Sequence, residues 1–181
     1  MRLRKFVFGA VCAASLSACV SDDSYQPTHF AAAPAIDFLE AKRDAGVKIS
    51  LLTNSLASHD VPAVNSHYEP WRDDIVNTGT KLYELRADAA IQSLVDVPPV
   101  SGKFVGLHTK ASVSDGRHVF IGSMNLDPRS AAINTEMGAM VDSPELAEDM
   151  AKIIERNMNG ENAWQVKMDE KGGLSWVNSE E

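Results

Sequence analysis

Two segments of the chain repeat the same order of signals, in which a helical pattern ends at a glycine and a β-rich run follows. The first pattern ends at Gly46 and leads into residues 47–53, and the second ends at Gly79 and leads into residues 80–85. Helices that alternate with strands cover the faces of a central sheet. We therefore expect an α/β fold with a mixed β-sheet flanked by helices.

The remaining signals extend this sheet. At 181 residues and 44% hydrophobic content, the chain has room for one such core. We predict little regular structure for residues 86–102. Further along we expect two strands joined at Asp115-Gly116, a strand over 136–141, a helix over 143–158 with Ser143 as its N-cap, and a hairpin over 164–177.

The N-terminus has the layout of a secretory signal peptide. Three basic residues precede an apolar run over residues 6–16, which is too short to span a bilayer. The run ends at Leu-Ser-Ala-Cys, where small residues before Cys19 resemble a bacterial lipobox. We predict that Cys19 is acylated and becomes the mature N-terminus, with an ordinary signal peptide as the alternative.

This prediction divides the chain into a signal peptide (1–18), a lipidated N-terminus and flexible tether (19–34), and a folded unit (35–181). The protein would be lipid-anchored in the cell envelope on the periplasmic side, and Val20 after the cysteine favours the outer membrane. Loss of three basic residues changes the formal charge from -8 to -11, which makes nucleic acid a less favourable partner.

One segment carries the chemistry: His108, one residue, Lys110, four residues, Asp115, six residues, Gly122-Ser123, one residue, Asn125. Residues two apart in a strand share a face, so His108 and Lys110 project together.

A two-residue turn at Asp115-Gly116 would pair Ser114 with Arg117 and place Ser123 opposite His108. Asn125 would share that face. An imidazole, an ammonium, a hydroxyl and a carboxamide together suit a phosphoryl group. Asp115 itself fits the turn better than a catalytic role, because Asp-Gly is a favoured hairpin dipeptide.

The motif and the residues after it, GSMNLDPRS at 122–130, resemble the signature of the phospholipase D superfamily. The run LLTNSLASHDVPAV at 51–64 is similar to the bacterial cardiolipin-synthase-like branch of that superfamily. The resemblance covers residues 35–177. It implies a phospholipase D-like half-domain that acts on phospholipids or other phosphodiesters.

The resemblance also implies roles for single residues. His108 would attack phosphorus and form a phosphohistidine, while Lys110, Ser123 and Asn125 would stabilise the phosphoryl oxygens. Asp115 is the third member of the motif, and Glu136 matches an acid that orients the histidine. Apart from the resemblance, Arg129 would pair with a neighbour or cap the loop after the motif, or else reach a phosphate. This chemistry requires no metal and no other cofactor.

The sequence departs from the family pattern in two ways. The family places two motifs around one site, and this chain has one, so a homodimer or a partner half-domain would have to supply the other. The resemblance also begins only at residue 35, after the point where the first strand of the family's sheet would lie. This leaves open that the first strand is missing.

Three functions follow from these departures. The first is a phosphodiester-cleaving or phosphatidyl-transferring enzyme of phospholipids. The alternatives are a dimeric single-motif nuclease and a catalytically inactive, truncated lipoprotein of the same superfamily.

Overall fold

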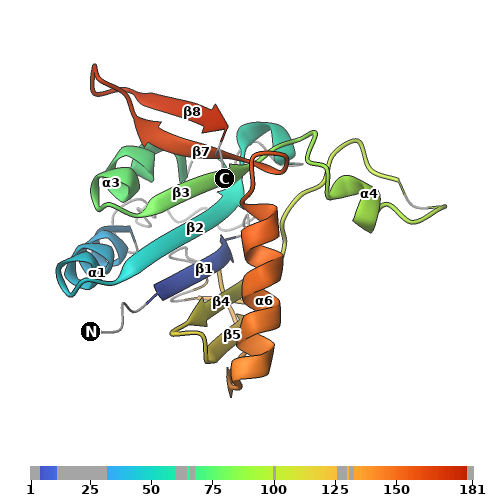
Figure 1. Ribbon diagram of the computed structural model, residues 1–181, viewed down its shortest axis with the longest axis horizontal. Helices are drawn as coiled ribbons and strands as arrows, with labels where there is room; N and C mark the ends of the chain where they lie inside the picture. Colours follow the sequence, from blue (N-terminus) through green and yellow to red (C-terminus); the bar gives the residue numbers. More distant parts are fainter. Residues whose placement is uncertain are drawn as a thin grey trace.

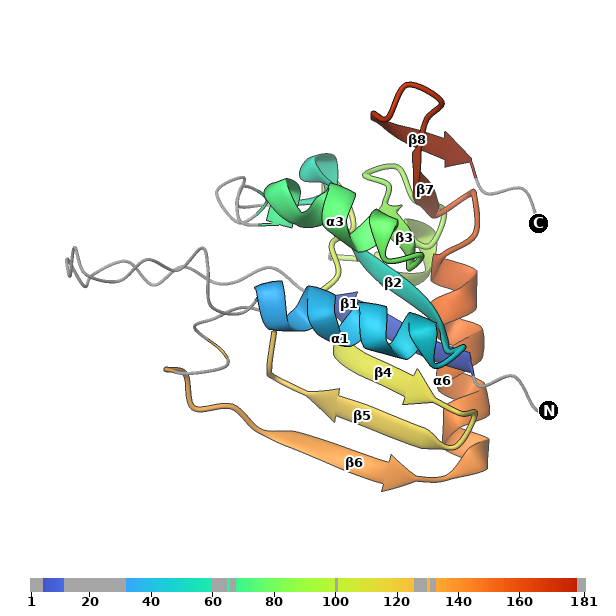
Figure 2. The same cartoon turned by 90° about the vertical axis from the view of Figure 1, so that its left-hand side faces the viewer.

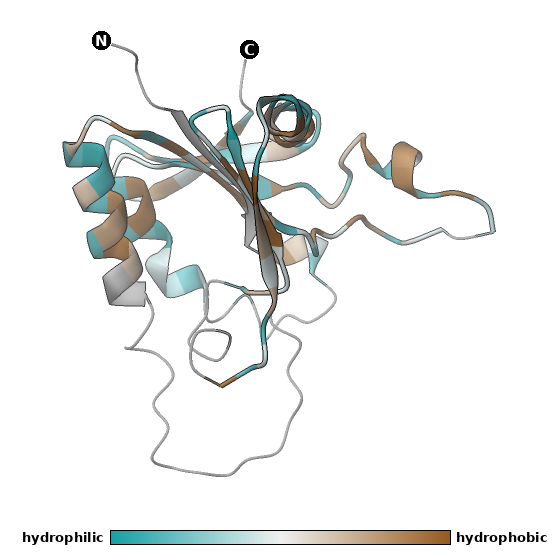
Figure 3. Cartoon of the chain, turned by 90° about the horizontal axis from the view of Figure 1, so that it is seen from below, coloured by the Kyte–Doolittle hydropathy of each residue, from teal (hydrophilic) through white to brown (hydrophobic). Residues whose placement is uncertain are grey.

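The computed structural model describes residues 5–11, 32–59, 65, 68–99, 101–125, 130 and 133–178. These residues form one eight-stranded mixed sheet in the order β6-β5-β4-β1-β2-β3-β7-β8, with helices on both faces (Figures 1 and 3). β1, β2 and β3 run parallel, and the neighbours on either side are antiparallel. The structure therefore confirms the predicted α/β class.

Most elements follow the sequence signals; β1 and α4 were not predicted. The strands are β1 (Lys5–Val11), β2 (Lys48–Asn54), β3 (Lys81–Leu85), β4 (Lys110–Ser114), β5 (His118–Gly122), β6 (Gly138–Asp142), β7 (Ala163–Met168) and β8 (Leu174–Asn178). The helices are α1 (Ala32–Asp44), η1 (Leu56–Ser58), η2 (Glu69–Trp71), α3 (Arg72–Asn77), α4 (Gln92–Val95) and α6 (Pro144–Asn157).

β1 is the main difference from the sequence analysis, which left open that a strand was missing. Residues 5–11 occupy the centre of the sheet, where Phe8 lies opposite Leu51 of β2 and Ser112 of β4. A short apolar run has the composition of a buried parallel strand as well as that of a leader, and periodicity does not separate the two. Cys19 lies outside the described residues, so its acylation stays a prediction.

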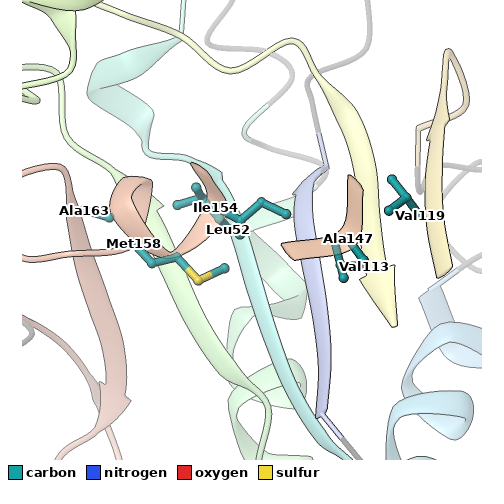
Figure 4. Packing of buried hydrophobic residues seen from close by; sticks show 7 residues of the cluster. All are labelled: Leu52, Val113, Val119, Ala147, Ile154, Met158 and Ala163. Carbon is teal, nitrogen blue, oxygen red and sulfur yellow. The ribbon is translucent and has the colours of Figure 1, made fainter. Parts of the chain in front are cut away.

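One face of the sheet is covered by α6. The helix begins as predicted, because the Ser143 side chain accepts a hydrogen bond of 3.2 Å from the Leu146 amide and Pro144 occupies the first turn. Its apolar side packs on the strands in a cluster shown in Figure 4. The cluster consists of Leu52, Val113, Val119, Ala147, Ile154, Met158 and Ala163. Full burial of the leucine, valine, isoleucine and methionine side chains among them stabilises the fold by about 1.5–3 kcal/mol each.

The opposite face carries α1 and α3 (Figures 1 and 3). Leu51, Leu82 and Val166 form the buried cluster there. Next to it lies a buried polar group that the sequence analysis missed. Glu84, which is 2% exposed, accepts hydrogen bonds from Arg72 Nε at 2.7 Å and from the Tyr68 hydroxyl at 3.0 Å.

The hairpin of β4 and β5 has a different register from the predicted one. Ser114 pairs with His118 and not with Arg117. Asp115 and Gly116 both have positive φ, 54° and 61°, as the Asp-Gly turn requires. Arg117 is an extra residue, because its amide closes the turn on Ser114 while its side chain pairs with Asp142 of β6. The loop therefore holds three residues, and every later pair is shifted by one.

Among the described helices, none has the length and apolar character needed to cross a membrane.

Candidate active site

Four motif residues gather at one end of the sheet: His108, Lys110, Ser123 and Asn125. β1, β2 and β3 end there and β4 begins there, at the side of Figure 2 where β5 also ends. Carboxyl ends of parallel strands are where open α/β sheets bind ligands. A cavity of about 460 Å³ opens at this edge, lined by His108, Thr109, Lys110, Ile121, Gly122, Ser123, Asn125, Asn134 and Glu136.

His108 and Lys110 are in direct contact at the start of β4. Lys110 Nζ lies 3.2 Å from His108 Nε2 and donates to the His108 carbonyl oxygen at 2.8 Å. An ammonium has only donors, so Nε2 is the acceptor and the ring proton of neutral His108 lies on Nδ1. Both residues line the cavity, where the unprotonated nitrogen of the imidazole lies beside the Lys110 ammonium.

Ser123 reaches the cavity although the strand register differs from the predicted one. β5 ends at Gly122, and the chain then leaves the regular alternation of the strand. The Ser123 amide donates to the Met137 carbonyl at 2.9 Å, and the Met137 amide donates to Ser123 Oγ at 3.0 Å. These bonds hold the hydroxyl in place, so Ser123 lines the same cavity as His108 despite the one-residue shift in strand register.

Glu136 accepts a hydrogen bond from Ser123 Oγ at 2.5 Å and one from Asn134 Nδ2 at 3.2 Å. The Ser123 bond is the largest cause that lowers the pKa of Glu136, followed by a bond from Ser130; Lys110 adds a smaller charge effect. Its described hydrogen bonds thus come from Ser123, Ser130 and Asn134. Orientation of His108 by Glu136, which the family resemblance implied, stays a prediction.

Asn125 is 9% exposed, and its Oδ1 has no hydrogen-bond partner among the described residues. A buried amide oxygen without a partner costs about 1–3 kcal/mol. Such a group is expected where a ligand completes the bonding. Turning the carboxamide about its last side-chain bond would offer the Nδ2 donor in the same place.

Asp115 lies at the far end of β4 from His108, in the exposed turn, and does not line the cavity. The five-residue strand β4, about 16 Å long, lies between the two residues, so the structure places Asp115 in the hairpin turn. Arg129 and Cys19 lie outside the described residues.

Sequence reasoning missed Asn134, which lines the cavity and donates to Glu136. The sequence signal that could have found Asn134 is its position two residues before Glu136. The described part of the chain contains no group of three histidine, cysteine, aspartate or glutamate side chains that could hold a metal ion.

The cavity of this sheet joins a histidine, a lysine, a serine and two carboxamides, as expected of a phosphoryl-binding site. Residues 21–158 match the family described as cardiolipin synthase, PLD-like domain. The chain belongs to this family, within the phospholipase D superfamily.

Three known proteins illustrate the relationship. The chain is 41% identical over 134 residues to cardiolipin synthase C of Escherichia coli K12; the match covers 73% of this chain and 28% of that relative. In structure it resembles Nuc of Salmonella typhimurium, a phospholipase D family member, with a TM-score of 0.55 at 16% identity, covering 90% of this chain and 82% of Nuc. It also resembles NucT of Helicobacter pylori, with a TM-score of 0.51 at 14% identity, covering 84% and 77%. The chain thus spans less than a third of the cardiolipin synthase that it matches.

Proposed function

We propose that the chain cleaves or transfers phosphodiester bonds of phospholipid head groups through a phosphohistidine on His108. The observation that carries this proposal is the contact between His108 Nε2 and Lys110 Nζ, at 3.2 Å, in a cavity shared with Ser123 and Asn125. Nε2 would attack phosphorus while the bond to the head-group or glycerol oxygen breaks. Water or a second alcohol would then attack phosphorus and release the histidine.

The reaction needs two further contributions besides the nucleophile. Charge that develops on the phosphoryl oxygens would be met by Lys110, Ser123 and Asn125. The leaving alcohol needs a proton, and we assign that role to a second histidine from another copy of the chain or from a partner half-domain. Two copies of His108 facing one phosphorus would complete the site.

A phospholipid is favoured over nucleic acid for two reasons besides the relative's name. The formal charge of -8 opposes a broad contact with a phosphate backbone. Exposed apolar side chains lie in the lining or next to it in sequence: Ile121 lines the cavity and is 40% exposed, and Met124 and Met137, which adjoin lining residues in the chain, are 40% and 82% exposed. Exposed apolar side chains beside a polar cavity suit a substrate with a phosphate head and an acyl tail.

We place the protein in the cell envelope, lipid-anchored through Cys19. This location would bring the cavity to its substrate, and it follows from the N-terminal sequence alone. Cleavage before Cys19 would remove β1 together with the leader, so the anchored form would need another strand at the centre of the sheet.

The test is hydrolysis of bis-para-nitrophenyl phosphate by the full chain at several protein concentrations, beside His108→Ala and the matched control His118→Ala. His118 lies in β5 outside the cavity. We expect turnover that rises more steeply than the protein concentration, that His108→Ala abolishes and that His118→Ala preserves. Cleavage of phosphatidylglycerol in vesicles, without cleavage of DNA, would support a lipid substrate. Equal turnover by the His108 variant would refute the proposal.

A further inference from the structure

Asn54 connects the end of β2 to the segment that carries the nucleophile. It is the last residue of β2, is 3% exposed, and belongs to the run at 51–64. Its Nδ2 donates to the Leu107 carbonyl at 3.0 Å, and its Oδ1 accepts from the Leu107 amide at 2.7 Å. One side chain thus binds both main-chain groups of the residue before His108.

These two hydrogen bonds take the place of the strand-to-strand hydrogen bonds that Leu107 would make inside a sheet. Residues 105–109 are in neither helix nor strand, and β4 begins only at Lys110. The pairing of β4 with β1 starts at Ala111. A main-chain segment outside a ladder needs other partners for its polar groups, and Asn54 supplies two of them to Leu107.

Two other contacts hold the same segment in place. A Cβ at Gly106 would lie 3.1 Å from the Ser58 carbonyl oxygen, which shows how closely the chain passes the loop after β2. The Leu107 side chain packs against two buried clusters. Ser58 Oγ also lies 3.5 Å from Asn54 Oδ1. The backbone just before His108 is therefore held by the Asn54 side chain and by the packing of Leu107, and it passes close to Ser58.

We infer that Asn54 is a positioning residue for His108, an inference that rests on the proposed function. By holding Leu107, Asn54 fixes the position of the His108 backbone and therefore the place where His108 Nε2 contacts Lys110 Nζ. A misplacement of about 1 Å at a reacting atom can cost roughly a hundredfold in rate. Asn54→Asp keeps the acceptor for the Leu107 amide but sets an oxygen against the Leu107 carbonyl, and Asn54→Ala removes both bonds.

Asn162, which is not among the residues that line the cavity, offers a matched control. It is 2% exposed, and its side chain likewise joins two main-chain groups, donating to the Arg156 carbonyl at 2.9 Å and accepting from the Ile91 amide at 2.9 Å. Asn162→Asp therefore makes the equivalent change, since it keeps the acceptor for the Ile91 amide and sets an oxygen against the Arg156 carbonyl, and neither bond involves the segment before His108.

The experiment measures kcat, KM and thermal unfolding of the full chain with Asn54→Asp, Asn54→Ala or Asn162→Asp. Variants that fold should show kcat lowered by about 10- to 100-fold for either Asn54 change, with KM within about twofold. Asn162→Asp should leave kcat unchanged. Equal losses in the Asn54 and Asn162 variants would overturn the inference, because they would reflect general destabilisation.

A second readout does not depend on turnover. Nitrogen chemical shifts of the His108 imidazole should show a single tautomer, with the proton on Nδ1, in the parent and in Asn162→Asp. They should show an average of tautomers in the Asn54 variants. Unchanged shifts in folded Asn54 variants would overturn the inference even if no variant had activity, whereas a lack of turnover in the parent alone would refute only the proposed function.

Discussion

Removal of the Arg72 guanidinium should destabilise the protein strongly, because Glu84 would lose its charged partner inside the core. The side chains of Arg72 and Glu84 are 8% and 2% exposed, and Nε lies 2.7 Å from Oε1. The other Glu84 donors are neutral: the Tyr68 hydroxyl at 3.0 Å and Trp176 Nε1 at 2.8 Å. Burial, followed by the charge of Glu84, raises the pKa of Tyr68, so the phenol stays a donor.

The expected magnitude follows from this burial. An uncompensated buried charge costs about 3–5 kcal/mol when one partner of the pair is removed. For a chain of this size, that corresponds to a fall in Tm of roughly 6–20 °C. Arg72→Met preserves much of the side-chain volume and removes the charge. The double variant Arg72→Met/Glu84→Gln removes both charges and should regain most of the loss.

The assay is urea unfolding followed by tryptophan fluorescence, with Arg117→Met as the control. Arg117 pairs with Asp142 at the surface, where both side chains are about half exposed, so its loss should change stability little. A change below about 1 kcal/mol for Arg72→Met would refute the reasoning, since it would fall within the range of surface pairs. A double variant as unstable as the single one would also refute it.

Three further predictions concern the site and the sheet. Ser123→Ala should raise the pKa of Glu136 toward its ordinary value of 4.5, as measured by NMR titration of the carboxyl group. Since that pKa is lowered in the folded state, its contribution to stability is present above pH 4.5 and is lost as the pH falls through the lowered value; an unchanged titration in Ser123→Ala would contradict this account. Gly122→Ala should lower both Tm and activity, because the new Cβ would lie 2.7 Å from the carbonyl oxygen of Met137, the residue before β6. A variant that behaves like the parent would show that the two segments can separate there. Val7→Pro should lower Tm by several degrees, because it removes a backbone hydrogen bond between strands at the centre of the sheet. The control Ser101→Pro, in an exposed loop, should not lower Tm. Equal Tm values for the two variants would argue that β1 is dispensable.

The sequence by itself determined the elements whose signals are local. The glycine-terminated helical patterns, the Ser143 cap and the Asp-Gly turn each depend on residues close together in the chain, and each predicted an element that the structure contains. The spacing of His108, Lys110, Ser123 and Asn125 also predicted a shared site and the family. Local periodicity and motif spacing are enough for such features, because neighbouring residues fix their geometry.

Only the tertiary structure decided which distant segments meet. A one-residue difference in a turn shifts a whole strand, so the contact of Ser123 with Glu136 could not be read from spacing. The place of β1 depends on two neighbours that lie about 40 and 100 residues away in sequence. The hold of Asn54 on Leu107 joins residues 53 positions apart. Such contacts depend on how the whole sheet assembles, which no local pattern of residues specifies.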